Sequence, residues 1–274
     1  MKKSTLVKAL EKGICILVML VVLIPFIWMV CMAFKTDAEI MSFPPTFFPK
    51  EITLKHMTSI WKRIPLIIYI KNTVIFSIGV AFVSVMIDSL AGYAFARIRF
   101  KGRDVLFSLI LLTMMVPFQV TMIPLYIETY KFGLLNTFVG LILPRAATAY
   151  GIFFMRSFFL GLPKDLEEAA RIDGLNEFGI YMRIMLPLCK SAFITLFIFV
   201  LMGNWNDLLY PMMMTSSTNM RTLPAGLAMF VGEGLTEVGP SMAGAFISML
   251  PLFILYCFAQ KYFVQGIAVS GMKG

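Results

Sequence analysis

The sequence contains little charge for its length. Only 14% of its 274 residues are Asp, Glu, Lys or Arg, whereas 59% are hydrophobic, and a soluble domain carries roughly 25% charged residues. The mean hydropathy is +0.85, and several apolar runs reach about 20 residues, enough to cross a hydrocarbon core about 30 Å thick. Because these runs do not alternate with polar residues as barrel strands do, the sequence predicts an all-α polytopic membrane protein.

Residues that hold metals or perform catalysis are also scarce. His56 is the only histidine, and the four cysteines, Cys15, Cys31, Cys189 and Cys257, are far apart and form no C-x-x-C pair. We therefore predict no metal site and no redox pair, and we find no nucleophile–base set that would assign a catalytic residue. The chain also lacks the G-x4-G-K-[ST] loop that binds nucleotide phosphates.

The net charge of +9 does not indicate nucleic-acid binding. The basic residues lie mostly in short segments between apolar runs, where Lys and Arg determine membrane orientation. With six spans, 15 Lys and Arg lie on the side of the two termini, eight lie on the other side, and Arg145 falls within a span. This bias predicts that both termini are cytoplasmic.

The six spans are predicted at residues 13–34, 72–96, 105–127, 137–160, 188–210 and 241–262. The first is too long for the apolar region of a signal peptide, about 7–15 residues, so we expect it to be retained. Pro117, Pro124 and Pro144 are expected to bend the spans that contain them. We divide the chain into an N-terminal stub, first span and external loop (1–71), a core membrane domain (72–262) and a cytoplasmic tail (263–274).

A charged segment between the fourth and fifth spans, residues 161–187, is predicted to form two short helices on the cytoplasmic membrane surface. Pro163 suits the first turn of a helix, and the acidic residues after it favour the positive end of that helix. Gly174 stands where the helix would end in a left-handed residue. Asn176 can then cap a second helix.

The first of these helices is expected to present a docking face. Side chains at i, i+3 and i+4 share a face of a helix, so we expect an apolar patch of Leu166, Ala169 and Ala170. Charges beside this patch come from Glu167, Glu168 and Arg171. Small alanines would let a partner approach the backbone closely.

The same segment carries a spaced motif. From Glu168 to Pro187 it reads E-A-A-x3-G-x9-I-x-L-P, which resembles the cytoplasmic signature of ABC-importer permeases. In that family, a separate ATPase moves the membrane subunit through this segment. By this resemblance, the ATPase-coupling residues are Glu168, Ala169, Ala170, Gly174, Ile184, Leu186 and Pro187.

Other stretches resemble the same family, and together they cover about residues 14–274. Residues 89–97 resemble the end of its second helix, residues 151–156 the approach to the coupling segment, and Asn204-Trp205-Asn206-Asp207 the end of its fifth helix. The tail G-I-A-V-S-G-M-K-G, residues 266–274, is similar to that of the maltose-type, carbohydrate-uptake branch.

The resemblance implies a type I ABC-importer permease with six transmembrane helices and a short cytoplasmic coupling-helix pair. Such a chain is a transport subunit of a bacterial or archaeal plasma membrane, not an enzyme, and it imports a sugar or oligosaccharide. Its implied partners are a second permease subunit, an ATPase dimer that binds ATP and Mg, an extracytoplasmic substrate-binding protein and membrane lipid. No cofactor is implied within this chain.

Charged and amide side chains within the spans are candidates for a substrate path, because such groups are costly in a bilayer and usually face a cavity or a partner. The candidates are Asp88, Gln119, Asn204, Asn206 and Asp207. Asn204 and Asp207 lie three residues apart and are expected to share a helix face. The alternatives are that these side chains cap or join helices, and that Asp88 pairs with Arg145.

Two other functions are considered. An ion-coupled secondary transporter would fit the six spans, but the coupling motif and the lack of a clear inverted repeat argue against it. A membrane-embedded enzyme would need paired ligands or a nucleophile, which the sequence does not offer.

Overall fold

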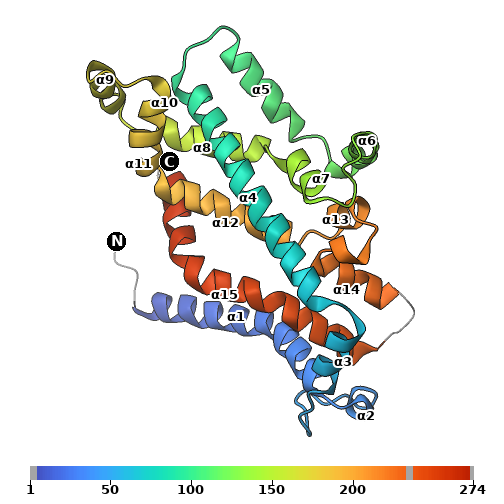
Figure 1. The fold of residues 1–274 in the computed structure, drawn as a ribbon. Helices are drawn as coiled ribbons and strands as arrows, with labels where there is room; N and C mark the ends of the chain where they lie inside the picture. Colours follow the sequence, from blue (N-terminus) through green and yellow to red (C-terminus); the bar gives the residue numbers. More distant parts are fainter. Residues whose placement is uncertain (1–4, 233–236, 272–274) are drawn as a thin grey trace. The chain divides into compact units, whose positions relative to one another are not determined.

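The computed structural model describes residues 5–232 and 237–271. Residues 1–4, 233–236 and 272–274, which include the start of the predicted stub and the end of the predicted tail, lie outside the described residues. Within the described ranges, every regular element is a helix, as predicted (Figure 1). The α-helices are α1 (Thr5–Phe34), α2 (Asp37–Ile40), α3 (Lys55–Arg63), α4 (Leu66–Arg97), α5 (Arg103–Thr113), α6 (Phe118–Lys131), α7 (Phe138–Ile142), α8 (Ala149–Leu160), α9 (Asp165–Ile172), α10 (Glu177–Ile180), α11 (Leu186–Leu188), α12 (Lys190–Trp205), α13 (Leu209–Met214), α14 (Leu223–Gly232) and α15 (Val238–Gly271), and shorter turns are η1 (Leu143–Arg145), η2 (Tyr181–Met185) and η3 (Thr218–Met220).

The chain forms two compact units. The first comprises Met1–Leu66 and Leu227–Pro251, and the second comprises Ile67–Gly226 and Leu252–Gly274. The predicted division into residues 1–71, 72–262 and 263–274 stays a prediction, because compactness alone does not define parts with separate functions.

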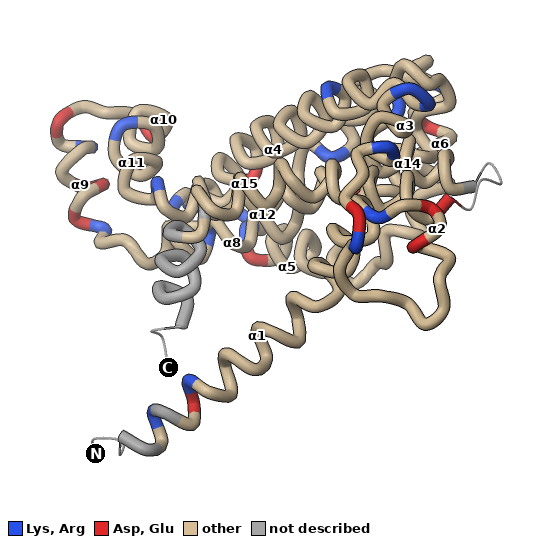
Figure 2. The backbone as a smooth tube through the Cα atoms, turned by 90° about the horizontal axis from the view of Figure 1, so that it is seen from below, with Lys and Arg blue, Asp and Glu red and all other residues tan. Residues whose placement is uncertain are grey.

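The first unit contains α1, whose charged residues lie in its early turns and whose remainder is apolar (Figure 2). Beyond α1, Ile60 of α3 is completely buried. Phe34, the last residue of α1, packs edge-on against Phe246 of α15 with ring centroids 5.8 Å apart. An ion pair of 2.7 Å joins Arg63 to Glu237 just before α15. The segment between α1 and α4 is therefore tied to the start of α15.

The second unit has an apolar core between α4, α8, α12 and the segment before α12. Val85, Met155 and Leu196, from three different helices, are fully buried there. Tyr93, Phe159 and Tyr181 complete the core at its charged end, where the three rings contact one another. This core supports the segment that carries the spaced motif.

Three described helices are long and apolar enough to cross a membrane: Leu10–Phe34, Leu66–Arg97 and Val238–Phe258. Three helix pairs pass the same test only as bent spans. Arg103–Thr113 and Phe118–Lys131 meet at 98°, Phe138–Arg145 and Ala149–Leu160 at 49°, and Glu177–Leu188 and Lys190–Trp205 at 81°. The predicted number of six spans is therefore reached if each bent pair crosses once, although the third pair begins at Glu177, before the predicted start of the fifth span at residue 188.

The predicted spans 105–127, 137–160 and 188–210 are not continuous helices. Pro117 precedes α6, and a proline disfavours the helical conformation of the residue before it, so α5 and α6 separate there. Pro144 lies in the turn η1 before the second break. Pro124, by contrast, lies inside α6. The fifth predicted span ends early, because α12 stops at Trp205.

Candidate functional site

The segment from Asp165 to Ile180 forms a helical hairpin, α9–α10, with a tight turn between its helices. Gly174 has a φ of +83°, in the left-handed region that glycine adopts without steric cost. Its N–H donates to Arg171 O at 3.1 Å, and the N–H of Leu175 donates to Ala170 O at 3.0 Å. These two bonds form a Schellman motif, which satisfies the last carbonyls of a helix.

The second helix of the hairpin is capped as the sequence predicts. The Asn176 side chain accepts a hydrogen bond from the Gly179 N–H at 2.7 Å. The start of the first helix differs from expectation, since α9 begins at Asp165 and Pro163 lies before it. Acidic residues still fill its first turn, where they complement the helix dipole.

A buried ion pair holds the inner face of the hairpin. The Nε atom of Arg97, the last residue of α4, lies 2.9 Å from Oε1 of Glu167, and the two side chains are only 3% and 4% exposed. Arg97 also donates to the carbonyl oxygens of Phe159 and Leu162, at 2.5 and 2.6 Å. One guanidinium therefore joins the end of α4, the end of α8 and the hairpin.

The turn of the hairpin has its own polar contacts. Arg171 donates to Glu177 at 2.9 Å, and the Tyr93 hydroxyl of α4 donates to the same carboxylate at 2.9 Å. The hydrogen bond from Arg171 lowers the pKa of Glu177 below its usual value, and the bond from Tyr93 acts in the same direction. Glu177 is therefore ionised at neutral pH and ties the two hairpin helices to α4.

The predicted docking patch is partly wrong. Ala170 is 3% exposed and packs inward together with Glu167, whereas Leu166 and Ala169 face outward. The spacing rule shows which residues share a face but does not show which face meets the protein. The inward role of Arg97 and Glu167 was missed, and the only signal was that Glu167 precedes Ala170 by three residues on one helix face.

The outward surface of the hairpin is unusually apolar for a charged segment. Ile172 is 87% exposed and Phe178 is 63% exposed, with Leu166 and Met182 also exposed beside them. Among the predicted coupling residues, Glu168, Ala169 and Gly174 belong to this outward surface. Exposed apolar groups rimmed by charges are typical of protein interaction sites.

The second half of the motif is structural in this chain. Ile184 and Leu186 are partly buried and pack against the apolar core of the second unit. Pro187 is exposed and lies within α11, at a position where its missing N–H is not needed. The π-helical turn η2, which contains Ile184, buries Tyr181, whose hydroxyl lies 2.5 Å from that of Ser89 on α4. The hairpin is thus continuous with the membrane core.

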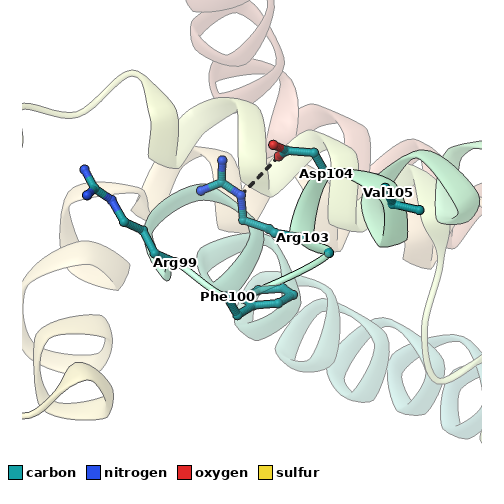
Figure 3. A pocket seen from close by; sticks show the side chains of 6 residues that line it. Arg99, Phe100, Arg103, Asp104 and Val105 are labelled. Atoms are coloured by element: carbon teal, nitrogen blue, oxygen red, sulfur yellow. Dashed lines mark hydrogen bonds and ion pairs between the residues drawn. The ribbon is translucent and has the colours of Figure 1, made fainter.

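Two cavities lie beside the hairpin and the loop after α4. One, of about 540 Å³, is lined by Arg99, Arg103, Lys164 and Glu168 among others. The other, of about 420 Å³, is lined by the loop and the first residues of α5, and Figure 3 shows Arg99 and Arg103 extending from the backbone there, with Arg103 bonded to Asp104 at 3.1 Å. The hairpin therefore has an adjacent polar hollow that a partner side chain could enter.

Asp88 is held entirely by its own chain. It is completely buried and accepts hydrogen bonds from the Thr148 N–H at 2.8 Å, the Thr148 hydroxyl at 2.7 Å and the Ser84 hydroxyl at 2.9 Å. Thr148 is the N-cap of α8, so this carboxylate fixes α4 to the start of α8. The alternative pairing with Arg145 is not what the described residues show.

Arg145 instead joins the break between α7 and α8 to the end of α12. Its guanidinium lies 2.5 Å from Asp207 and donates to Asn204 at 2.8 Å. The same group lies over the Tyr210 ring, 4.2 Å from its centroid, and over Phe118 at 5.1 Å. Asn204 and Asp207 thus do converge, and they converge on an arginine.

The remaining two candidates for the substrate path are exposed. Gln119 lies in the first turn of α6, and Asn206 follows the last residue of α12. The Asn206 side chain donates to the Met202 carbonyl at 3.1 Å, within its own helix end. The described residues contain no group of three or more His, Cys, Asp or Glu side chains that could hold a metal ion.

Comparisons with known proteins extend over most of the chain. The arabinooligosaccharides transport system permease protein AraQ of Halalkalibacterium halodurans is 36% identical over 253 residues, covering 91% of each chain. The lactose transport system permease protein LacG of Rhizobium radiobacter is 32% identical over 246 residues, covering 90% of this chain and 89% of LacG.

A solved structure shares the fold. A bacterial ABC transporter involved in the import of the acidic polysaccharide alginate contains a chain that matches with a TM-score of 0.83, covering 96% of this chain and 98% of that one, at 23% identity. The model of the binding-protein-dependent transport system inner membrane components matches residues 88–269, well over half of the 274 residues. Those residues include the hairpin, both residues of its buried ion pair, and helices α8 and α12 of the core that supports it. The chain therefore belongs to the family of binding-protein-dependent transport system inner membrane components.

Proposed function

We propose that this chain is the membrane-spanning permease subunit of an ATP-driven importer that takes up a sugar or an oligosaccharide. The names of its relatives support the substrate class, because AraQ and LacG are transport permeases for arabinooligosaccharides and lactose. A third relative, NgcG of Streptomyces coelicolor, 28% identical over 257 residues that cover 92% of this chain and 85% of NgcG, belongs to an uptake system for diacetylchitobiose. Nothing in these comparisons supports an ion-coupled transporter.

The observation that carries the proposal is the α9–α10 hairpin. Its outward surface presents exposed Ile172 and Phe178, while its inward surface is anchored to α4 and α8 through Arg97 and Glu167. A surface that is apolar outside and rigidly tied inside can pass a partner's movement to the membrane helices. The partner that fits is a separate ATPase dimer, which would bind ATP and Mg on the cytoplasmic side.

Membership of the family supports further partners. One alginate-importer structure was solved with a periplasmic protein bound to an alginate pentasaccharide, and by analogy a substrate-binding protein would deliver the sugar to this chain. A second permease subunit would complete the membrane path. The Lys and Arg bias supports a cytoplasmic location for both termini and for the hairpin.

The contacts of the polar side chains within the spans favour a structural role for most of them over direct contact with the substrate. Asp88 accepts a hydrogen bond from Thr148, and Asn204 and Asp207 both bind Arg145. Asn206 and Gln119 are exposed, so these two side chains are the better candidates for contact with a sugar. Neutral sugars need such amide donors and acceptors.

Photo-crosslinking tests the proposed docking surface. A benzoyl-phenylalanine placed at Ile172 or Phe178 should crosslink to the ATPase subunit in membranes that contain the complete transporter. The same residue placed at Phe26, exposed on α1, is the control and should not reach the ATPase. Crosslinks from Phe26 alone, with none from the hairpin, would refute the docking role.

A further inference from the structure

The segment after α1 folds back along that helix. At its far end, the Thr53 N–H donates to the carbonyl of Phe34, the last residue of α1, at 2.9 Å. Midway, Phe47 packs edge-on against Trp28 with ring centroids 5.4 Å apart. Trp28 precedes Phe34 by six residues, which is about 9 Å along a helix. Because helical side chains lean toward the N-terminus of the helix, the Trp28 ring and the Phe47 ring packed against it lie well before the C-terminal end of α1 along the helix axis.

Polar contacts hold this folded-back segment in one conformation. The Lys35 ammonium, on a side chain that is almost completely buried, lies over the Trp28 ring at 4.8 Å and donates to the Thr46 carbonyl. The Glu39 carboxylate accepts from the Thr46 hydroxyl at 2.7 Å and from the Lys50 N–H at 3.0 Å. These bonds fix both sides of the turn that carries Phe47.

The same segment exposes large apolar side chains. Phe43 is 95% exposed, Met41 78%, Ile52 77% and Phe48 68%. Several large exposed apolar side chains on one short segment are typical of an interaction site. Phe48 also packs against Phe47, with ring centroids 5.0 Å apart, so the exposed surface is continuous with the contact to Trp28.

We propose that residues 41–52 insert their apolar side chains into the lipid at the membrane boundary reached by the end of α1. The apolar helix Leu10–Phe34 has 25 residues, about 37 Å at 1.5 Å per residue, against a hydrocarbon core about 30 Å thick. A helix centred in that core places Trp28 inside its edge, and Phe47 with it.

Lipid fits the surface better than water or a soluble partner. The apolar window of α1 is 0% buried within the chain, and the exposed side chains of residues 41–52 continue that surface beyond Trp28. Tryptophan is enriched at membrane interfaces, and the buried Lys35 ammonium donates a hydrogen bond to a backbone carbonyl, as a charge removed from water requires. The proposal rests on α1 crossing the membrane, and it does not depend on which substrate is carried.

Depth-resolved quenching tests this proposal on the complete transporter in lipid nanodiscs. The exposed Cys15 and Cys257 are replaced by serine, and a fluorophore is attached to Phe43→Cys or Phe48→Cys. We expect strong quenching by lipids with a doxyl group near the glycerol level, and at least several-fold weaker quenching by an aqueous nickel chelate. Phe26→Cys on α1 serves as the lipid-exposed control, and Ser217→Cys, in a loop predicted to be external, serves as the aqueous control.

Two results would overturn the proposal. Phe43 and Phe48 reporters quenched like Ser217, by the nickel chelate alone, would place the segment in water. Reporters shielded from both quenchers in the full complex would mean that a protein partner covers it. Benzoyl-phenylalanine at position 43 provides a second measurement that keeps an aromatic side chain, and it should yield lipid adducts by mass spectrometry. ATP-driven uptake, measured in parallel, separates a failure of this proposal from a failure of the proposed function.

Discussion

Arg97 and Glu167, separated by 70 positions in the sequence, form an ion pair of 2.9 Å in which both side chains are almost completely buried. The guanidinium is shared with two backbone carbonyls near the end of α8. Three elements therefore meet at one side chain, next to the surface that we assign to ATPase docking. A movement of the α9–α10 hairpin would be transmitted to α4 and α8 at this point.

The first prediction concerns this pair. Arg97→Ala removes the closer partner of the buried Glu167 carboxylate and leaves it only the more distant Arg171, at 3.5 Å, and loss of one partner from a buried pair costs about 3–5 kcal/mol. We expect lower yield and loss of ATP-driven uptake. Arg97→Lys keeps the charge but cannot reach both carbonyls and Glu167, so it should restore yield more than uptake.

Lys101→Ala, at an exposed residue in the loop that follows α4, is the matched control and should transport normally. Measuring uptake per inserted subunit separates folding from coupling. Equal recovery of yield and uptake in Arg97→Lys would show that Arg97 only stabilises the fold.

The second prediction concerns the turn of the hairpin. Gly174 has a positive φ and open space around the position of a Cβ, so within this chain a substitution there acts through backbone strain. Gly174→Val should cost about 1–2 kcal/mol and impair ATP-driven uptake, whereas Gly174→Asn should be better tolerated because asparagine adopts the left-handed conformation more readily.

Gly203→Ala, in α12 with open space and no positive φ, should be neutral. The measurement is initial uptake rate per inserted subunit in the four proteins. Normal uptake by Gly174→Val would show that the turn is not required for coupling.

The turn of the hairpin and the cap of its second helix could be predicted from the sequence. Gly174 and Asn176 predicted the turn and the cap because both effects are local, involving residues within five positions of each other. The breaks at Pro117 and Pro144 were also foreseeable, although the bend angles were not. What could not be predicted was which helix face meets the core, and therefore that Glu167 and Ala170 point inward and that Leu166 points outward.

The partners of polar side chains that are distant in the sequence could not be predicted either. Arg145 could have paired with any intramembrane carboxylate, and only the fold shows that it binds Asp207 and Asn204 while Asp88 binds Thr148. The folding back of residues 41–52 along α1 left no periodic signal, since it depends on single contacts such as Phe47 with Trp28.

The third prediction concerns topology, which rests on the Lys and Arg bias. A cysteine at exposed Ser217 should react with an impermeant thiol reagent added outside intact cells, and a cysteine at Ile172 of the hairpin should react only after permeabilisation. Both positions are exposed in the structure, so lack of labelling reflects the membrane. The reverse pattern is incompatible with a cytoplasmic hairpin.

The fourth prediction concerns Arg145 and its partners. Asn204→Ala or Asp207→Ala removes a hydrogen bond to a charged group, worth about 1.5–3 kcal/mol, and should lower yield while leaving the preference between two competing sugars unchanged. Asn206→Ala, at an exposed side chain, should leave yield intact and weaken uptake of one sugar relative to the other. A change of preference in Asn204→Ala or Asp207→Ala, at normal yield, would place them in the substrate path instead.

The energy source is the most direct test of the account. The chain is reconstituted in sealed liposomes with its second permease subunit, ATPase and binding protein, and uptake of a labelled oligosaccharide is measured with ATP and Mg on the hairpin side. We predict uptake that requires ATP, persists when proton and sodium gradients are collapsed, and falls at least tenfold with Phe178→Asp on the docking surface. Uptake driven by an ion gradient without ATP, or unaffected by Phe178→Asp, would contradict the account.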